Sequence, residues 1–93
     1  MTLLKNNESF WIQSLASDLQ NCAYNLAQNS VDEAEIFLMH ARKIFVNIEN
    51  TRVNEDIIRY LNRSCRSEST IERLRLADKY STFADILLLQ SLS

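Results

Sequence analysis

The 93-residue sequence contains no glycine and no proline, although about eleven such residues are expected at the usual frequencies of roughly 7% and 5%. Tight β-hairpin turns depend on glycine or asparagine at positive φ, and small strand-rich domains need many such turns. Helices joined by short polar links need few, and the nine asparagines and ten serines can cap and connect them. The sequence therefore predicts an all-α fold.

The absence of glycine also excludes several functional motifs. Phosphate-binding loops, dinucleotide fingerprints, nucleophile elbows and standard calcium loops each need glycine where the backbone turns sharply or approaches a ligand. The acidic residues are scattered, and no pair of them stands out for acid–base chemistry. We therefore expect no catalytic residue and no cofactor-binding residue, and we interpret the chain as a protein that is not an enzyme.

Cysteine and histidine are scarce. Cys22 and Cys65 are too few for a disulfide framework, and both fall at apolar positions of predicted helices, where cysteine behaves as a small hydrophobe. A zinc site needs about four ligands. The residues three and four positions from His40, the single histidine, are not metal ligands: Ile36, Phe37, Lys43 and Ile44. We expect no metal site.

The stretch "HARK", which begins at His40, resembles the helix of histidine-phosphotransfer bundles, in which a lysine follows the histidine by three positions. Lys43 matches that lysine. The next residue in those sites is usually glycine, and it is Ile44 here. We therefore interpret His40 as a residue at the edge of an apolar helix face.

Long apolar runs are missing as well. The N-terminus, "MTLLKNNESF", lacks the apolar segment of roughly 7–15 residues that a signal peptide needs, and nothing approaches the roughly 18 apolar residues of a membrane span. A net charge of −2, with 46% hydrophobic and 24% charged residues, is typical of a globular chain. We expect a single helical domain over residues 1–93, located in the cytoplasm.

Caps and apolar periodicity predict two long helices in the first half of the chain. The first begins at Asn7 or Ser9, stops near Asn29, and carries one apolar stripe: Ile12, Leu15, Leu19, Cys22 and Leu26. Ser30 and Glu33 form a capping box that opens the second helix, and its stripe is Val31, Ala34, Leu38, Ala41, Phe45 and Ile48. Because the link is so short, the two helices should form an antiparallel hairpin.

The second half predicts a short helix and a long one. Asn54 can cap the third helix, which the segment "RSCRSES" ends and whose inward residues are Ile57, Leu61 and Cys65. Ser69 and Glu72 form another capping box, which opens a final helix from about residue 70. The sequence allows either one continuous final helix or two shorter helices that meet near Ser81.

The expected architecture is a small four-helix bundle with more apolar surface than one core can cover. A helix that packs on one core needs an apolar stripe somewhat over 100° wide. Met39 and Val46 fall outside the stripe of the second helix, and Leu88 and Leu89 belong to a run of four aliphatic residues. Either the last helix lies in a groove between other helices, or a second chain covers it. We favour a homodimer or another helical partner.

A row of arginines gives a second candidate surface. Arg59, Arg63 and Arg66 have the spacing i, i+4, i+7, so they should line up on one side of the third helix, next to Tyr60. A solvated helix face has the same pattern. Arginine nevertheless suits bidentate contacts with carboxylates and phosphates, so the row could contact an acidic partner or a phosphate backbone.

Two functions remain open. The first is a non-enzymatic protein–protein interaction or regulatory protein that acts through an apolar helix face, with Met39, Val46, Leu88, Leu89 and the arginine row as partner-binding residues. The alternative is a small DNA-binding regulator that uses Arg59, Arg63 and Arg66, with the third and fourth helices as a helix-turn-helix. The negative net charge argues against the alternative. We expect neither a membrane nor a small-molecule substrate as a partner.

Overall fold

The computed structural model describes the backbone of residues 2–92 and the side chains of residues 7–92. It contains four α-helices: α1 (Thr2–Ala27), α2 (Val31–Phe45), α3 (Glu55–Leu61) and α4 (Thr70–Ser91). A short 3-10 turn, η1 (Asn50–Arg52), lies between α2 and α3. Residues 2–92 contain no β-strand, which confirms the all-α prediction.

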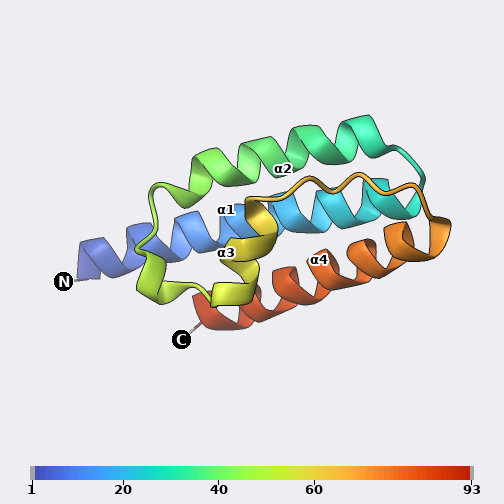
Figure 1. Cartoon of the computed structure of the whole chain (residues 1–93). Helices are drawn as coiled ribbons and strands as arrows, with labels where there is room; N and C mark the ends of the chain where they lie inside the picture. The colour runs from blue at the N-terminus through green and yellow to red at the C-terminus, as the bar shows by residue number, and fades with distance from the viewer. Residues whose placement is uncertain (1, 93) are drawn as a thin grey trace.

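The long helices are arranged around α1 (Figure 1). Helices α2 and α4 both run antiparallel to α1 and pack against it on different sides. Helix α3 crosses the long helices, and the following link, residues 62–69, runs back along α2 toward the start of α4. The structure contains the expected elements: a hairpin of two long helices, a short third helix and a long last helix.

Helix α1 supplies the centre of the core. All five residues of its predicted apolar stripe are buried, and Ala16 and Ala23 widen the buried surface on the side of the neighbouring helix. Helix α2 contributes two alanines and two aliphatic residues, and the alanines let the helix axes approach closely, whereas α4 also contributes two aromatic residues. The buried residues of these two helices are Ala34, Leu38, Ala41 and Ile44 in α2, and Leu76, Ala77, Tyr80, Phe83, Ala84 and Leu87 in α4.

An aromatic cluster fixes the short helix α3 on α4. Tyr80 is fully buried, and its hydroxyl donates to the backbone carbonyl of Tyr60 at 3.1 Å. The rings of Tyr60 and Phe83 make an edge-to-face contact with centroids 5.3 Å apart, and Tyr60 meets Tyr80 in the same way at 6.1 Å. Such pairs add stability beyond the area they bury, so a helix of two turns is held without extensive backbone contacts.

The helix ends follow most of the predicted caps. Asn29 has φ of 62°, the left-handed conformation that ends α1 and that asparagine tolerates better than most residues. The side chains of Asn54 and Ser69 accept hydrogen bonds from the first-turn backbone N–H groups of α3 and α4. Ser30 precedes α2 as expected, but its side chain makes no capping hydrogen bond.

Several boundaries differ from the prediction. Helix α1 begins at Thr2 rather than at Asn7 or Ser9. Helix α3 ends at Leu61, so Cys65 lies in the link and not on the helix. Helix α4 continues through Ser81 without a break. Within residues 2–92, no helix combines the length and the apolar character needed to cross a bilayer.

Replacement of Leu19 by alanine should lower the free energy of unfolding by about 2–5 kcal/mol, because a fully buried side chain at the centre of α1 would leave a cavity. Urea denaturation followed by circular dichroism measures the change. Asn21→Ala is the matched control, since Asn21 is exposed on the same helix and should shift stability by only about 0.5 kcal/mol. Equal losses in both variants would contradict the central position of Leu19.

Candidate functional site

The link between α3 and α4 is fastened to α2 by a row of polar side chains. The carboxylate of Glu35 accepts hydrogen bonds from the Ser64 hydroxyl and the Cys65 backbone N–H, both at 2.8 Å, and from the Cys65 thiol at 3.2 Å. Arg42, two turns further along α2, donates to the backbone carbonyls of Leu61 and Arg63. Side chains of α2 thereby make hydrogen bonds with backbone groups of the extended link, which in a helix would bond to each other.

The two thiols beside this row are buried. Cys22 and Cys65 are both free and fully buried. The pKa of the Cys65 thiol is raised because it is hydrogen-bonded to the Cys22 thiol, buried, and placed beside the Glu35 carboxylate. The thiolate, which is the nucleophilic form, is therefore disfavoured. Both cysteines act as small core residues. The apolar-stripe position of Cys22 on α1 predicted this role, whereas Cys65 enters the core from the link.

The expected arginine row is not a helix face. Because α3 ends at Leu61, Arg63 and Arg66 lie in the link, and only Arg59 lies on the helix. Arg59 pairs with Asp56 one turn earlier at 2.8 Å, and Arg66 pairs with Asp32 of α2 at 2.6 Å. The guanidinium of Arg63 instead lies over the ring of Tyr60, 4.9 Å from its centroid. The structure thus places three arginines in three different environments.

The connection between α3 and α4 also differs from a helix-turn-helix. That motif joins its helices by a turn of about three or four residues. Here the connection spans residues 62–69 and is held in an extended path along α2. The arrangement on which the DNA-binding alternative was based is therefore not present in residues 54–91.

His40 lies where α2 meets α1. Its Nδ1 is 2.6 Å from Oδ2 of Asp18, and the carboxylate is almost completely buried whereas the imidazole is largely exposed. The exposed imidazole of His40 thus provides a hydrogen-bond partner for the buried carboxylate of Asp18, as expected for a buried polar group. In residues 7–92, no group of three or more histidine, cysteine, aspartate or glutamate side chains is placed to hold a metal ion.

The four apolar residues expected to contact a partner are all exposed, but they do not form one surface. The exposed fractions are 52% for Met39, 81% for Val46, 38% for Leu88 and 70% for Leu89. Met39 and Val46 belong to α2 and to the turn after it, whereas Leu88 and Leu89 belong to α4, on the other side of α1 (Figure 1). No single flat partner surface reaches both pairs.

A larger surface is formed by the outward sides of α1 and α4, and we name it the α1–α4 face. On α1 it consists of residues with the spacing 3, 4, 3, 4, 3: Phe10, Gln13, Ser17, Gln20, Tyr24 and Ala27. On α4 the spacing is 3, 4, 3, 4, 3, 4: Ile71, Leu74, Asp78, Ser81, Asp85, Leu88 and Leu92. All of these residues are exposed except Ser81, which is partly buried, and the spacing is that of a helix seam that meets another helix.

Backbone contacts fix the register of this face. The Ser9 hydroxyl donates to the Ser91 carbonyl at 2.9 Å, and Arg73 donates to the Leu26 carbonyl. Phe10 is therefore level with the end of α4, and Tyr24 lies near its start. A shallow groove of about 400 Å³ runs between Tyr24 and Leu74, floored by alanines. The face is apolar at both ends and polar with small residues in the middle.

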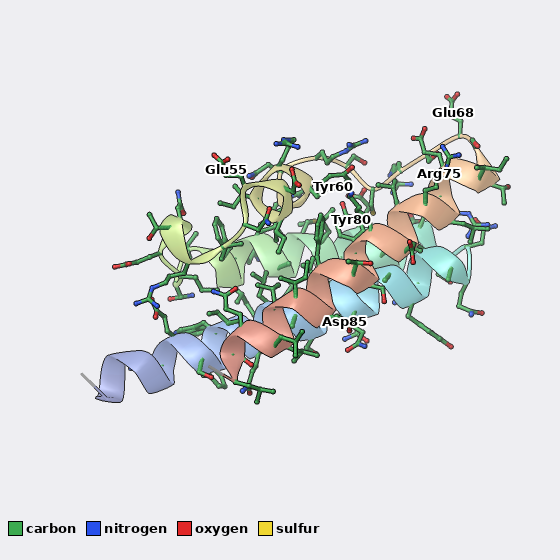
Figure 2. The ribbon with its side chains drawn as sticks, turned by 90° about the horizontal axis from the view of Figure 1, so that it is seen from below. Glu55, Tyr60, Glu68, Arg75, Tyr80 and Asp85 are labelled. Atoms are coloured by element: carbon green, nitrogen blue, oxygen red, sulfur yellow. The ribbon has the colours of Figure 1, made fainter. Side chains whose placement is uncertain are left out.

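A second surface, which we name the basic groove, lies between α3 and α4 on the other side of α4. It is a groove of about 280 Å³ lined by Tyr60, Arg63, Glu72, Arg75, Leu76 and Lys79. Figure 2 shows Tyr60 and Tyr80 between the two helices, with Arg75 on α4. Of the residues expected to bind a partner, the structure brings together only Tyr60 and Arg63 here.

The residues that complete these surfaces have only weak signals in the sequence. Lys79 joins the basic groove because α4 returns past Tyr60, a contact between residues far apart in the chain. Gln20, Ser17 and Asp78 follow a heptad spacing but are polar, so a search for apolar stripes passes over them. Comparison with known proteins adds no further information: no family model, no curated protein and no solved structure matches the chain.

The carboxylate of Glu35 should make stability depend on pH. Burial raises its pKa, but the hydrogen bonds from Ser64 and Cys65 outweigh burial, and the pKa is lowered from its ordinary value of 4.5. A carboxylate whose pKa is lowered by folding stabilises the folded state above its ordinary pKa, and this contribution is lost as the pH falls through the folded pKa. The contribution is therefore complete at pH 7, begins to decrease near pH 4.5 and is lost as the pH falls through the lower pKa of the folded state.

Glu35→Gln should accordingly lower the free energy of unfolding by about 1–2 kcal/mol at pH 7, because hydrogen bonds to a charged group are replaced by weaker ones. The difference from the wild type should shrink toward zero as the pH is lowered below 4.5 in denaturation experiments. Glu33→Gln removes an exposed charge from the same helix and serves as the control. A pH-independent difference, or an equal effect of both variants, would contradict the role of Glu35 in holding the link.

Proposed function

We propose that the chain is a non-enzymatic protein–protein interaction protein that acts through an apolar helix face, and that the α1–α4 face is this surface. The supporting observation is the exposed double seam, in which two long helices present matching heptad spacings with large apolar residues at both ends. Isolated exposed apolar residues are common on protein surfaces, whereas groups of large apolar residues at both ends of one helix–helix face favour an interface.

The partner we propose is a second copy of the chain. A two-fold axis parallel to the helices would place α1 of one copy on α4 of the other, with residues at the same level facing each other. Phe10 would then meet Leu88 and Leu92 of the second copy, and Tyr24 would meet Leu74. Each apolar end of the face would be covered by the corresponding apolar end of its partner.

The polar residues of the face fit the same arrangement. Asp78 and Asp85 of one copy would face the amides of Gln20 and Gln13 of the other, so each carboxylate would gain a hydrogen-bond donor. A two-fold axis across the helices would instead bring Asp78 opposite Asp85 of the second copy, and like charges repel. The distribution of acids on α4 and amides on α1 therefore favours the parallel axis.

The size of the face is sufficient for such a dimer. Residues 10–27 of α1 span about 26 Å at 1.5 Å per residue. Two helices about 10 Å apart give a face roughly 20 Å wide, or about 500 Å² per copy. A total near 1,000 Å² is about the lower limit for a specific interface, so we expect a weak and reversible dimer.

Sedimentation equilibrium across micromolar to millimolar concentrations should show a reversible shift toward twice the 10.8 kDa mass of the chain. The double variant Phe10→Glu/Tyr24→Glu should remain monomeric, because it would bury two unpaired carboxylates against the apolar side chains of Leu74, Leu88 and Leu92 of the second copy. The matched control is Ile36→Glu/Met39→Glu, which makes the same charge change on exposed positions of α2 and should still dimerise.

A wild-type chain that stays monomeric at millimolar concentration would contradict a homodimer. If the α2 variant alone became monomeric, the interface would lie on α2 and the assignment to the α1–α4 face would be wrong. Circular dichroism of each variant establishes that helix content is retained, so that loss of association is not loss of folding.

A further inference from the structure

Two of the three cations of the basic groove, Arg63 and Lys79, are held by aromatic rings and not by acids. The guanidinium of Arg63 lies 4.9 Å from the centroid of Tyr60, and the ammonium of Lys79 lies 5.7 Å from the same centroid and 5.8 Å from that of Phe83. Within residues 7–92, no ion pair joins Arg63, Arg75 or Lys79 to a carboxylate. Arg59 and Arg66, by contrast, each have an acidic partner.

This arrangement prepares the groove for an anion. Contact with an aromatic face positions a cation without neutralising it, so its charge remains available to a ligand. The rings of Tyr60 and Phe83 are themselves fixed by edge-to-face contacts with each other and with Tyr80. Arg63 and Lys79 are therefore held on a rigid base, and a ligand needs to order fewer side chains when it binds.

The surroundings of the groove favour a protein ligand over a nucleic acid. Glu72 lines the groove together with the cations, so an uninterrupted polyanion would meet a like charge. The chain has a net charge of −2 and a pI of about 5.3, whereas nucleic-acid-binding domains usually carry a basic surface well beyond one groove. An acidic peptide segment can place carboxylates at two or three positions and leave the position at Glu72 uncharged.

We propose that the basic groove binds an acidic segment of a partner protein, with carboxylates on Arg63, Arg75 and Lys79 and the segment packed against Tyr60. The carboxylates would form charge-assisted hydrogen bonds with the guanidinium groups, which suit planar two-oxygen ligands. The groove lies on a different side of α4 from the α1–α4 face, so this proposal does not depend on the dimer.

Fluorescence anisotropy with a labelled peptide of alternating glutamate and alanine tests the site directly. Arg75→Gln/Lys79→Gln should weaken binding about tenfold, because it removes two of the three cations of the groove. The control Lys43→Gln/Arg59→Gln removes the same charge elsewhere on the surface and should weaken binding less than twofold. The mass of both variants in sedimentation should equal that of the wild type, which separates this site from the α1–α4 face.

Four outcomes would overturn the proposal. The wild type could fail to bind the glutamate peptide, or bind equally well a peptide in which glutamine replaces glutamate. Equal weakening in the two variants would show that overall charge, and not the groove, attracts the peptide. Tighter binding of a random duplex DNA than of the peptide, abolished by Arg75→Gln/Lys79→Gln, would assign the groove to nucleic acid.

Discussion

The packing of α1 between α2 and α4 is the constraint on which the rest of the structure depends. A helix has room for a neighbour on each side of its apolar stripe, and α1 uses both with residues that are almost all fully buried. The fourth position of a regular four-helix bundle is filled only by the short α3 and by a link without helical structure. Within residues 2–92, no helix covers the outward sides of α1 and α4.

The link shows how a chain without glycine or proline can include extended backbone inside a helical protein. Backbone groups outside helices need hydrogen-bond partners, and here side chains of α2 supply them. Glu35 and Arg42 are charged residues whose role is to bind backbone groups of the link, and Asp32 extends the row through Arg66. The same contacts bring Arg63 to Tyr60 and so shape one wall of the basic groove.

Apolar periodicity and capping residues were enough to predict the class, the number and the order of the helices, because burial of Leu15, Leu26 and Leu38 follows directly from their spacing. The end of α3 was predicted wrongly because Cys65 continues the spacing of Ile57 and Leu61, although it reaches the core from the link. Contacts between distant segments were not predictable: Glu35 with Cys65, or Lys79 with Tyr60, depend on the path of the whole chain. The partner-binding roles remain proposals, and they now involve two separate surfaces.

The central claim is that the α1–α4 face is covered by a second copy in which α1 faces α4. Disulfide trapping between Gln20→Cys and Asp78→Cys tests it most directly, since the native thiols are buried. Under mild oxidation, a mixture of the two variants should give a covalent dimer far more efficiently than either variant alone, because position 20 of one copy faces position 78 of the other. Equal trapping in the mixture and in the single variants, or no trapping at all, would contradict the account.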